Sequence, residues 1–360
     1  MSVGFIAPDV NALQITERQD STIKIGLLIQ DNNSFAARQG AELAILKANE
    51  TGGYQRKKFQ LVVRSMEGPW GTGSKQAVNL IFDEKVAVIM GSHDGRNAHL
   101  VEQVSTKARL VFLSCWAGDP TLSQAFVPWF FSCVPNDLRQ ADALFEEVYN
   151  RRKLNKIAAI SDNGYDSKLA MESFVKKAES KGKNVSLQLH YDFQNKDFND
   201  IVSQVHNAVI DGIILFGQPS ASLKLNRQLE QKKMNRTVFG TLSLLNEDEM
   251  QDNNLSDYKN MILVYPGNLS GSKGLAFRDE YLKTYGKLPG AVAAYSFDGM
   301  NILIEAIRKA GLDRENIQKT ISKMRFEGVT GLIQFDEKGK RTGTPGFMEI
   351  KNGVQVIPGK

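Results

Sequence analysis

The feature that most constrains the fold is a regular alternation of short apolar runs and helical patterns from residue 22 onward. Strand-length apolar runs occur at Ile23–Ile29, Phe59–Ser65, Val86–Met90 and Leu110–Leu113. A segment with apolar residues at helical spacing follows each of the first three. Strands that alternate with helices predict a parallel sheet with helices on both of its faces.

The alternation breaks between Cys115 and Val134 and then begins again. Within the break we expect Trp129–Phe131 to be exposed. Further strands are expected at Ile157–Ile160, Val185–Tyr191, Gly212–Phe216, Val238–Thr241 and Met261–Tyr265. The helices between them are expected at Ser167–Lys181, Phe198–Ala208 and Ala221–Lys233. The chain is therefore expected to hold two doubly wound α/β units in tandem.

Beyond Gly267 the pattern changes to consecutive helices followed by short strands. The helices are expected at Leu275–Tyr285, Ala291–Ala310 and Glu315–Met324, and the strands at Leu332–Phe335, Phe347–Ile350 and Val354–Ile357. Helices that come after two complete sheets indicate that the chain crosses back between the units. No low-complexity linker separates the two halves, which favours short hinge crossovers over a flexible tether.

Charge and composition exclude several classes of function. The chain has 45 Lys and Arg against 40 Asp and Glu, a net charge of +5, and no basic run with interleaved aromatics, so we expect no nucleic-acid partner. Its two cysteines, Cys115 and Cys133, form no C-x-x-C pair, and its 4 His are scattered. We therefore expect no metal and no cofactor.

Segments for targeting or membrane insertion are not visible in the sequence. No apolar run reaches the ~18 residues of a membrane-spanning helix. The stretch Met1–Asp20 has neither a basic start nor an apolar core of signal-peptide length. The start of the chain is compatible with a cytosolic protein or with a mature or trimmed form behind an added Met.

Motifs that would carry catalysis are incomplete. The glycine-rich stretch Gly68–Lys75 lies where a phosphate loop would be, but Ser74 precedes Lys75 instead of following it. Cys115 follows a buried strand, yet the sequence marks no base beside it, so we expect a packed small side chain. The chain is therefore expected not to be an enzyme. An enzyme that uses Cys115 or Asp94 is the alternative from another class.

Two loops that follow adjacent strands form the candidate ligand site. Gly91–Asn97 joins a strand to a helix, and its backbone amides with the helix N-terminus suit a carboxylate or another anion. Ser114–Asp119 follows the next strand with small residues and Trp116. Ligands of open α/β sheets bind at the carboxyl ends of the strands, where both loops are expected to lie.

Several segments, in order, carry a resemblance that covers nearly the whole chain from about residue 22. They are Gly40–Ala44, Val86–Ser92, Leu110–Ser114, Phe130–Asp137, Asp162–Asp166, Lys196–Val202, Tyr295–Gly299 and Gly331–Asp336. With them the sequence resembles the type I periplasmic solute-binding proteins of the branched-chain amino acid (Leu/Ile/Val) ABC-transporter family. The Asp162–Asp166 segment is similar to an aspartate–tyrosine–glycine turn of that family.

The resemblance implies two lobes joined by three crossovers, which enclose a ligand by hinge closure. It implies a non-catalytic protein of the periplasm or cell surface that delivers a small amino-acid-like or carboxylate ligand to an ABC permease. A ligand-sensing protein of the same fold is the alternative. The expected division is an N-terminal extension at 1–21, a first lobe of 22–137 plus 267–328, and a second lobe of 138–266 plus 329–360.

The resemblance also implies ligand-binding residues, which are carried over one by one. They are Trp70, His93, Gly95, Arg96, Ser114, Trp116, Ala117, Tyr165, Gln218 and Leu242. In amino-acid-binding members, groups of the first two loops hold the ligand carboxylate, and here those positions fall near Gly95 and Trp116. Arg96 stands where a small hydroxyl residue is expected.

One departure concerns the ligand's ammonium group. Amino-acid-binding members hold it with an acidic residue in a turn of the second lobe, where this chain has Leu242. A buried ammonium without a counter-charge is costly, so another acid is needed, and the candidates are Asp31, Glu67, Asp94 and Asp298. The alternative ligand is an anionic or aromatic carboxylate without an amine, held by Arg96 and stacked on Trp116 or Trp70.

Overall fold

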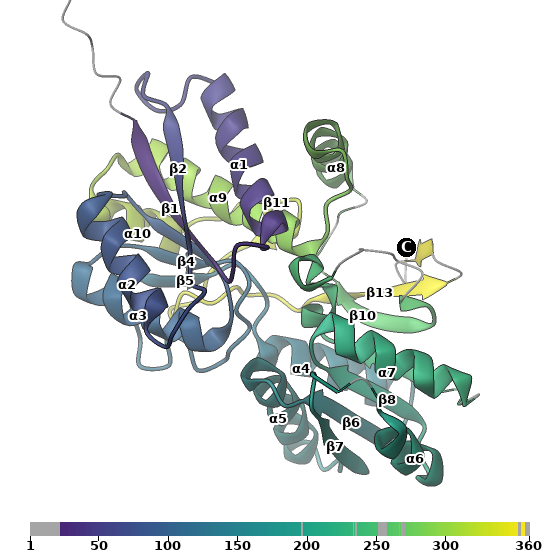
Figure 1. Ribbon diagram of the computed structural model, residues 1–360. Coiled ribbons are helices and arrows are strands. Elements are labelled where there is room, and N and C mark those ends of the chain that lie inside the picture. The colour runs from purple at the N-terminus through teal and green to yellow at the C-terminus, as the bar shows by residue number, and fades with distance from the viewer. Residues whose placement is uncertain are drawn as a thin grey trace, which may run out of the picture.

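A computed structural model describes residues 22–195, 197–232, 234, 236–250, 258–265, 267, 269, 271–351 and 354–356. It shows two α/β lobes that the chain connects by three crossovers (Figure 1). The expected N-terminal extension 1–21, Lys196, Lys233 and Ile357 lie outside the described residues.

The first lobe is built on a parallel sheet of five strands. They are β1 (Ile23–Ile29), β2 (Phe59–Ser65), β3 (Ile89–Ser92), β4 (Phe112–Ser114) and β5 (Phe130–Ser132). The strand order β2-β1-β3-β4-β5 changes direction between β1 and β3. At such a switch point the connections leave the sheet on opposite faces, and a crevice opens at the carboxyl ends of the strands.

Helices cover both faces of this sheet. On one face lie α1 (Phe35–Glu50) and α9 (Ala291–Ala310); on the other lie α2 (Thr72–Val78, extended by a π-helical turn at Asn79–Asp83) and α3 (Gly95–Ala108). The helices α8 (Ser272–Tyr285) and α10 (Arg314–Ser322) pack at the edge of the α1–α9 layer. The Tyr281 hydroxyl of α8 donates a hydrogen bond of 2.8 Å to the Gln39 side chain of α1.

The second lobe has the same parallel order with an antiparallel addition. Its strands are β6 (Ile157–Asp162), β7 (Leu187–Tyr191), β8 (Gly212–Phe216), β9 (Thr237–Gly240), β10 (Met261–Tyr265), β13 (Gly346–Lys351) and β14 (Val354–Val356). They run in the order β14-β13-β10-β9-β8-β6-β7, with β13 antiparallel to both of its neighbours. The switch point lies between β6 and β8.

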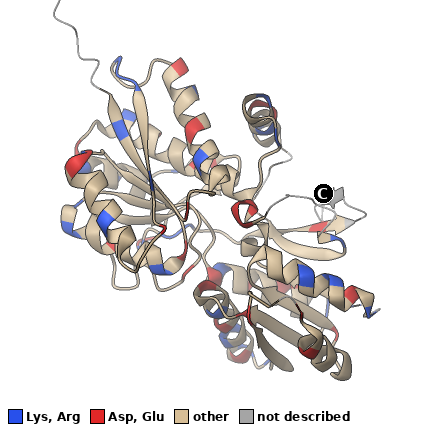
Figure 2. Cartoon of the chain, viewed as in Figure 1, with Lys and Arg blue, Asp and Glu red and all other residues tan. Residues whose placement is uncertain are grey.

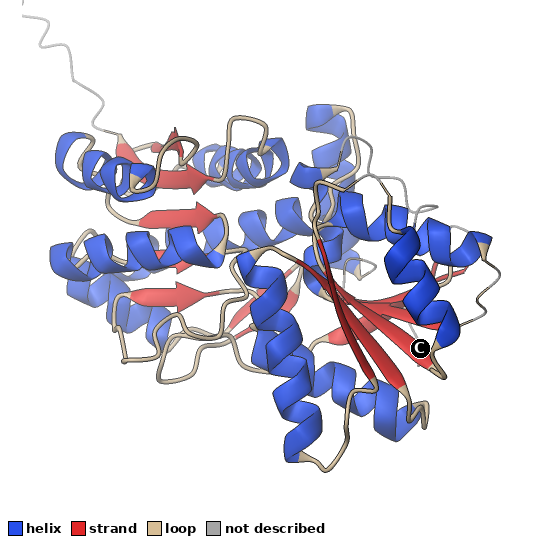
Figure 3. Ribbon diagram, turned by 60° about the horizontal axis from the view of Figure 1, so that its bottom comes forward, coloured by secondary structure: helices blue, strands red, loops and turns tan. Residues whose placement is uncertain are grey.

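Helices again lie on both faces of the second sheet (Figure 3). They are α4 (Asp137–Phe145, extended by a π-helical segment at Glu146–Arg151), α5 (Tyr165–Ser180), α6 (Asn199–Asn207) and α7 (Pro219–Gln231). The helices α4 and α5 pack together on one face, and α6 and α7 lie on the other.

Three crossovers form the hinge between the lobes: β5 to α4, β10 to α8, and β12 (Gly331–Ile333) to β13. The strand β12 pairs with β11 (Phe326–Gly328) in a small antiparallel sheet. The buried Asp298 carboxylate accepts hydrogen bonds from the Val329 and Thr330 amides at 2.9 and 2.8 Å. The Arg341 guanidinium donates to the Cys133 and Thr330 carbonyls, which ties the third crossover to the first.

The predicted fold class is confirmed, with two doubly wound lobes and a chain that returns after Gly267. One expectation was wrong: Phe130 and Phe131 are 1% and 2% exposed and form most of β5, a strand that the sequence pattern did not predict. Helix α4 was also missed, although Asn136 caps it by accepting a hydrogen bond from the Arg139 amide. The exact limits of the two lobes stay a prediction.

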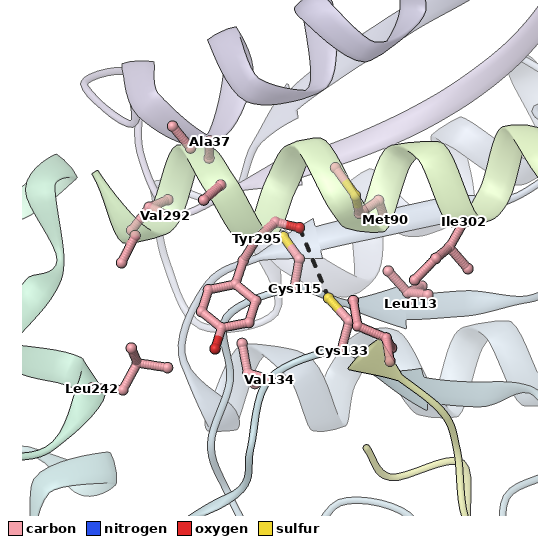
Figure 4. Packing of buried hydrophobic residues seen from close by; sticks show 14 of the residues in the cluster. Ala37, Met90, Leu113, Cys115, Cys133, Val134, Leu242, Val292, Tyr295 and Ile302 are labelled. Atoms are coloured by element: carbon pink, nitrogen blue, oxygen red, sulfur yellow. Dashed lines mark hydrogen bonds between the residues drawn. The ribbon is translucent and has the colours of Figure 1, made fainter. Parts of the chain in front are cut away.

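The core beneath the carboxyl ends of the first sheet is tightly filled. Figure 4 shows Cys115, Cys133 and Tyr295 packed against one another below helix α9. Where α9 crosses α1, a Cβ placed on Gly40 would overlap the backbone of Ala293. The two helices therefore touch through main chain at this point, which only glycine permits.

The close approach of α1 and α9 predicts the effect of adding one methyl group. Gly40→Ala should lower the free energy of unfolding by about 1–3 kcal/mol, because the overpacked helix must shift. Alanine is by itself the better helix former, so the intrinsic effect has the opposite sign.

Urea unfolding followed by circular dichroism measures the change. Leu46→Ala, on the exposed face of the same helix, serves as the control and should change stability by no more than about 0.5 kcal/mol. A Gly40→Ala variant as stable as the parent protein would contradict the packing described.

Candidate functional site

A cavity lies between the two lobes, at the carboxyl ends of the strands that form both switch points. Its empty volume is about 870 Å³, the open mouth included. The first lobe contributes Gln30, Asp31 and Ser34 after β1, Ser92, His93 and Asp94 after β3, and Trp116 and Gly118 after β4. The second lobe contributes Asp166, Ser167 and Ala170 of α5, Gln218 after β8, and Leu242, Ser243, Asn246, Asp248 and Glu249 after β9. Pro135, Asp137 and Gln140 line it at the first crossover.

Acidic side chains dominate the polar part of this lining. Six carboxyl groups face the cavity, those of Asp31, Asp94, Asp137, Asp166, Asp248 and Glu249. None of the described residues that line it is a lysine or an arginine. His93 is buried against Phe112, and this burial lowers the pKa of His93, so the imidazole is neutral at pH 7. The field inside the cavity is therefore one that attracts positive charge.

Second-lobe carboxylates bind the N-termini of three first-lobe helices. Asp248 accepts hydrogen bonds from the Ala36 and Ala37 amides of α1 at 2.6 and 3.1 Å. Its neighbour Glu247 accepts from the Val292 and Ala293 amides of α9, both at 2.8 Å. These two acids lie in a short turn where the lobes meet, and that turn is red in Figure 2.

The third such contact involves helix α3. The Gly95 amide donates to both carboxylate oxygens of Asp166, at 3.1 and 3.0 Å. Negative charge is favoured at a helix N-terminus because the unpaired amides and the helix dipole are positive there. The three contacts hold the lobes together over the cavity.

The rim of the cavity beside α3 carries a further link between the lobes. The Tyr165 hydroxyl donates a 3.1 Å hydrogen bond to Asp119, and the Arg96 guanidinium lies 5.6 Å from the centre of the Tyr165 ring. Hydrogen bonds with Asp119 and Glu102 raise the pKa of His99 to about 9. His99 is therefore charged at pH 7 and neutralises part of the acidic charge at this rim.

Four of the acids that face the cavity have raised pKa values and hold their protons more tightly than a free carboxyl group does. Burial raises the pKa of Asp166 to about 7 and that of Asp248 to about 6. Burial also raises the pKa of Glu249 to about 8, and the neighbouring Asp162 and Asp166 add to the effect. For Asp137, burial raises the pKa well above its usual range. A cation inside the cavity would reverse these shifts because it stabilises the ionised forms.

The ten residues predicted from the sequence fall into four groups. His93, Trp116, Gln218 and Leu242 line the cavity, while Gly95, Arg96 and Tyr165 lie at its rim. Ser114 and Ala117 are buried below it and bind each other, the Ala117 amide donating to the Ser114 hydroxyl at 3.2 Å. Trp70 is 74% exposed and is not part of the lining. The structure thus brings four of the ten together around one space.

Of the acids considered as counter-charges, two face the cavity and two do not. Asp31 and Asp94 line it, but Asp94 caps α3 by accepting a 2.7 Å hydrogen bond from the Asn97 amide. Asp298 holds the hinge strands, and Glu67 binds Asn32 on the surface.

Sequence reasoning missed Asp137, Asp166, Asp248 and Glu249. One signal was present, the run of three acids Glu247–Glu249 soon after Leu242. Glu249 accepts a 2.8 Å hydrogen bond from the Asn246 side chain. The Gln218 side chain donates to the same carboxylate when its amide is oriented with the nitrogen toward Glu249. Leu242 itself is fixed by its amide, which donates to the Gln140 side chain at 2.8 Å.

The Cys115 thiol is buried and donates a hydrogen bond to the Gly91 carbonyl. Burial raises the pKa of its thiol to about 12, so the nucleophilic thiolate is strongly disfavoured. Among the described residues, no group of three or more His, Cys, Asp or Glu could hold a metal ion. The helices in the described part of the chain include none long and apolar enough to span a membrane.

Comparison with known proteins identifies relatives for nearly the whole length. Residues 22–353 match the family described as periplasmic binding protein. The Leu/Ile/Val-binding protein homolog 3 of Brucella melitensis is 26% identical over 63% of this chain, and the match spans 62% of that protein. A leucine-, isoleucine-, valine-, threonine- and alanine-binding protein of Pseudomonas aeruginosa is 23% identical over 84% of this chain and 81% of its own length.

Solved structures show the same fold. The branched-chain amino acid transporter substrate-binding protein LivJ of Streptococcus pneumoniae, in complex with isoleucine, has a TM-score of 0.83 at 21% identity and covers 94% of this chain and 100% of its own. A solute-binding protein of an ABC transporter from R. palustris, in complex with benzoate, has a TM-score of 0.81 at 16% identity and covers 94% and 96%.

The raised pKa values of the cavity acids predict how stability depends on pH without a ligand. A carboxyl group whose pKa is raised by folding stabilises the native state below its unfolded pKa, and this stabilisation is lost as pH rises through the folded pKa. The free energy of unfolding should therefore fall between about pH 5 and pH 8.

Urea unfolding at several pH values measures this slope. Glu249→Gln should make the slope shallower, because it removes one of the titrating groups. Glu179→Gln, at an exposed site on α5, should leave the slope unchanged. A free energy of unfolding that rises over this pH range would contradict the prediction and show that folding does not raise the pKa values of these acids.

Proposed function

This chain belongs to the periplasmic binding protein family, and from that premise we propose that it is an extracytoplasmic receptor for a small organic solute with an amine group. It captures the solute between its two lobes by hinge closure and delivers it to an ABC permease. The observation that carries the proposal is the cavity at both switch points, to which each lobe contributes acidic side chains.

The acid missing at Leu242 is replaced in this proposal by Glu249. Both residues follow β9 and line the same cavity. The Glu249 carboxylate contacts only side-chain amides, those of Asn246 and Gln218, so its charge has no cationic partner among the described residues that line the cavity. An ammonium group bound there would gain a charge-assisted hydrogen bond.

The alternative ligand, a carboxylate without an amine, has less support. It requires a cation in the cavity, and Arg96 is instead exposed at the rim with its guanidinium over Tyr165. The structural neighbours bind isoleucine in one case and benzoate in another, so the fold itself accommodates both ligand classes. The charge of the cavity lining supports the amine.

Lobe closure follows from the position of the ligand. A solute that contacts both lobes binds the closed form more tightly, and this differential affinity shifts the population toward closure. The carboxylate contacts to α1, α3 and α9 join the two lobes, so in this proposal they stabilise the closed state. A permease would then recognise the closed receptor.

The role of Glu249 can be tested with a solute that the protein retains. Native mass spectrometry identifies what co-purifies, and isothermal titration measures its affinity for the parent protein and for Glu249→Gln. The variant should bind at least about tenfold more weakly, because the amide cannot pair with the ammonium. Glu179→Gln should bind as the parent does. Equal affinity for all three would contradict the proposal.

Closure itself predicts a change of shape. The retained solute is first removed by unfolding and refolding the protein. The radius of gyration from small-angle X-ray scattering should then decrease when the solute is added back at saturating concentration. A radius that does not change on binding would exclude hinge closure as the mode of capture.

A further inference from the structure

We infer that the ligand is an organic amine that carries no carboxylate group, because Asp166 of the second lobe fills the anion-binding end of helix α3. The inference rests on the proposed function and narrows its ligand class. Three features of the cavity carry it: the occupied helix N-termini, the unpaired acids and the apolar wall.

Helix α3 begins at the cavity, where its first amides would suit the carboxylate of an amino acid. Two of those amides, of Gly95 and Asn97, are already used. Gly95 donates to both oxygens of Asp166, and Asn97 donates to Asp94. A Cβ on Gly95 would lie only 2.7 Å from an Asp166 oxygen, so the carboxylate is seated directly against the helix end.

The other two helix N-termini that meet the second lobe are occupied in the same way. The amides of α1 bind Asp248, and those of α9 bind Glu247. Within the cavity a ligand carboxylate would therefore compete with two carboxylates of the protein, Asp166 and Asp248. It would also enter a cavity with six acidic side chains and no lysine or arginine among its described lining residues.

Two of the six acids, Asp137 and Glu249, accept no hydrogen bond from a backbone amide of the described residues. Asp137 is 6% exposed and lines the cavity, and its carboxylate accepts one 3.3 Å hydrogen bond from the Gln140 amide group. Glu249 likewise contacts only side-chain amides. A buried carboxyl group ionises readily only when a positive charge approaches it, so Asp137 indicates a cationic ligand independently of the helix ends. Glu249 is an exposed residue of the lining, and it adds negative charge that no lysine or arginine among the described lining residues offsets.

The rest of the lining suits the organic part of an amine. Trp116, Leu242, Ala170 and Pro135 supply apolar surface, and the Trp116 ring lies 6.3 Å from the ring of Tyr295 in an edge-on arrangement. An alkyl or aromatic body can pack on this wall while its ammonium points to the acids. The indole also attracts cations through its π face.

Matched pairs of probes that differ only by a carboxylate test the inference. Isoamylamine is paired with leucine, phenethylamine with phenylalanine, and cadaverine with lysine, and benzoate represents carboxylates without an amine. Isothermal titration after removal of any retained solute measures each affinity. The parent protein should bind at least one amine about tenfold or more tightly than the matching amino acid.

Asp166→Ala frees the amide of Gly95 and removes a negative charge. It should raise the affinity for the amino acid of the pair by about tenfold or more and weaken the binding of the amine, so that the preference reverses. Asp200→Ala is the matched control, since Asp200 is an exposed aspartate in the first turn of α6, and it should leave the preference unchanged. Asp166→Asn removes the charge but keeps the shape of the side chain, so it provides the same test if the alanine variant does not fold.

The outcomes separate the inference from the proposed function. If the parent protein binds leucine more tightly than every amine, the inference is wrong and the proposed function stands. If it binds benzoate most tightly, the inference and the amine-binding part of the proposed function are both wrong. An unchanged preference in both Asp166 variants would also overturn the role given to Asp166. If no probe binds to any variant and no solute co-purifies, the proposed function falls together with the inference.

Discussion

The structure depends on carboxylates of one lobe that reach the helix N-termini of the other. Asp166, Glu247 and Asp248 supply the negative charges, and α3, α9 and α1 supply the amides. Each contact satisfies donors that a helix leaves unpaired in its first turn, and each forms only across the interface between the lobes. The same contacts close the cavity and set its electrostatic character.

The cavity exists because two sheets of equal topology face each other. In each lobe the strand order changes direction once, between β1 and β3 and between β6 and β8. The loops that leave these strands cannot pack on each other, since their helices lie on opposite faces of the sheet. Joining the lobes through three short crossovers turns the two crevices toward one another, and the hinge strands held by Asp298 and Arg341 keep them so.

Burial raises the pKa values of four cavity acids, those of Asp137, Asp166, Asp248 and Glu249. The pKa of Asp166 is raised to about 7 and that of Glu249 to about 8, so both carboxyl groups are partly protonated near neutral pH. A bound cation would favour the ionised form of both carboxyl groups. Binding and proton release are then linked, which is a general property of charged ligands in acidic cavities.

The alternation of apolar runs was sufficient to predict the fold, because period and length of these runs are local properties of the chain. It failed at β5 and α4, where three residues and a nine-residue helix follow a stretch that contains Pro120 and Pro128. Short strands carry too little pattern of their own, and their pairing partner decides them.

The candidate site was predicted in part. His93 and Trp116 follow strand ends, a position that the sequence reveals, and both line the cavity. Asp166, Asp248 and Glu249 could not be assigned, because their role depends on which helix end of the other lobe they meet. The sequence by itself determined the two α/β units, their family and the loops at the strand ends, since these follow from local periodicity and ordered motifs. Only the tertiary structure decided the charge of the cavity, because that charge arises from residues far apart in the chain that the fold brings to one place.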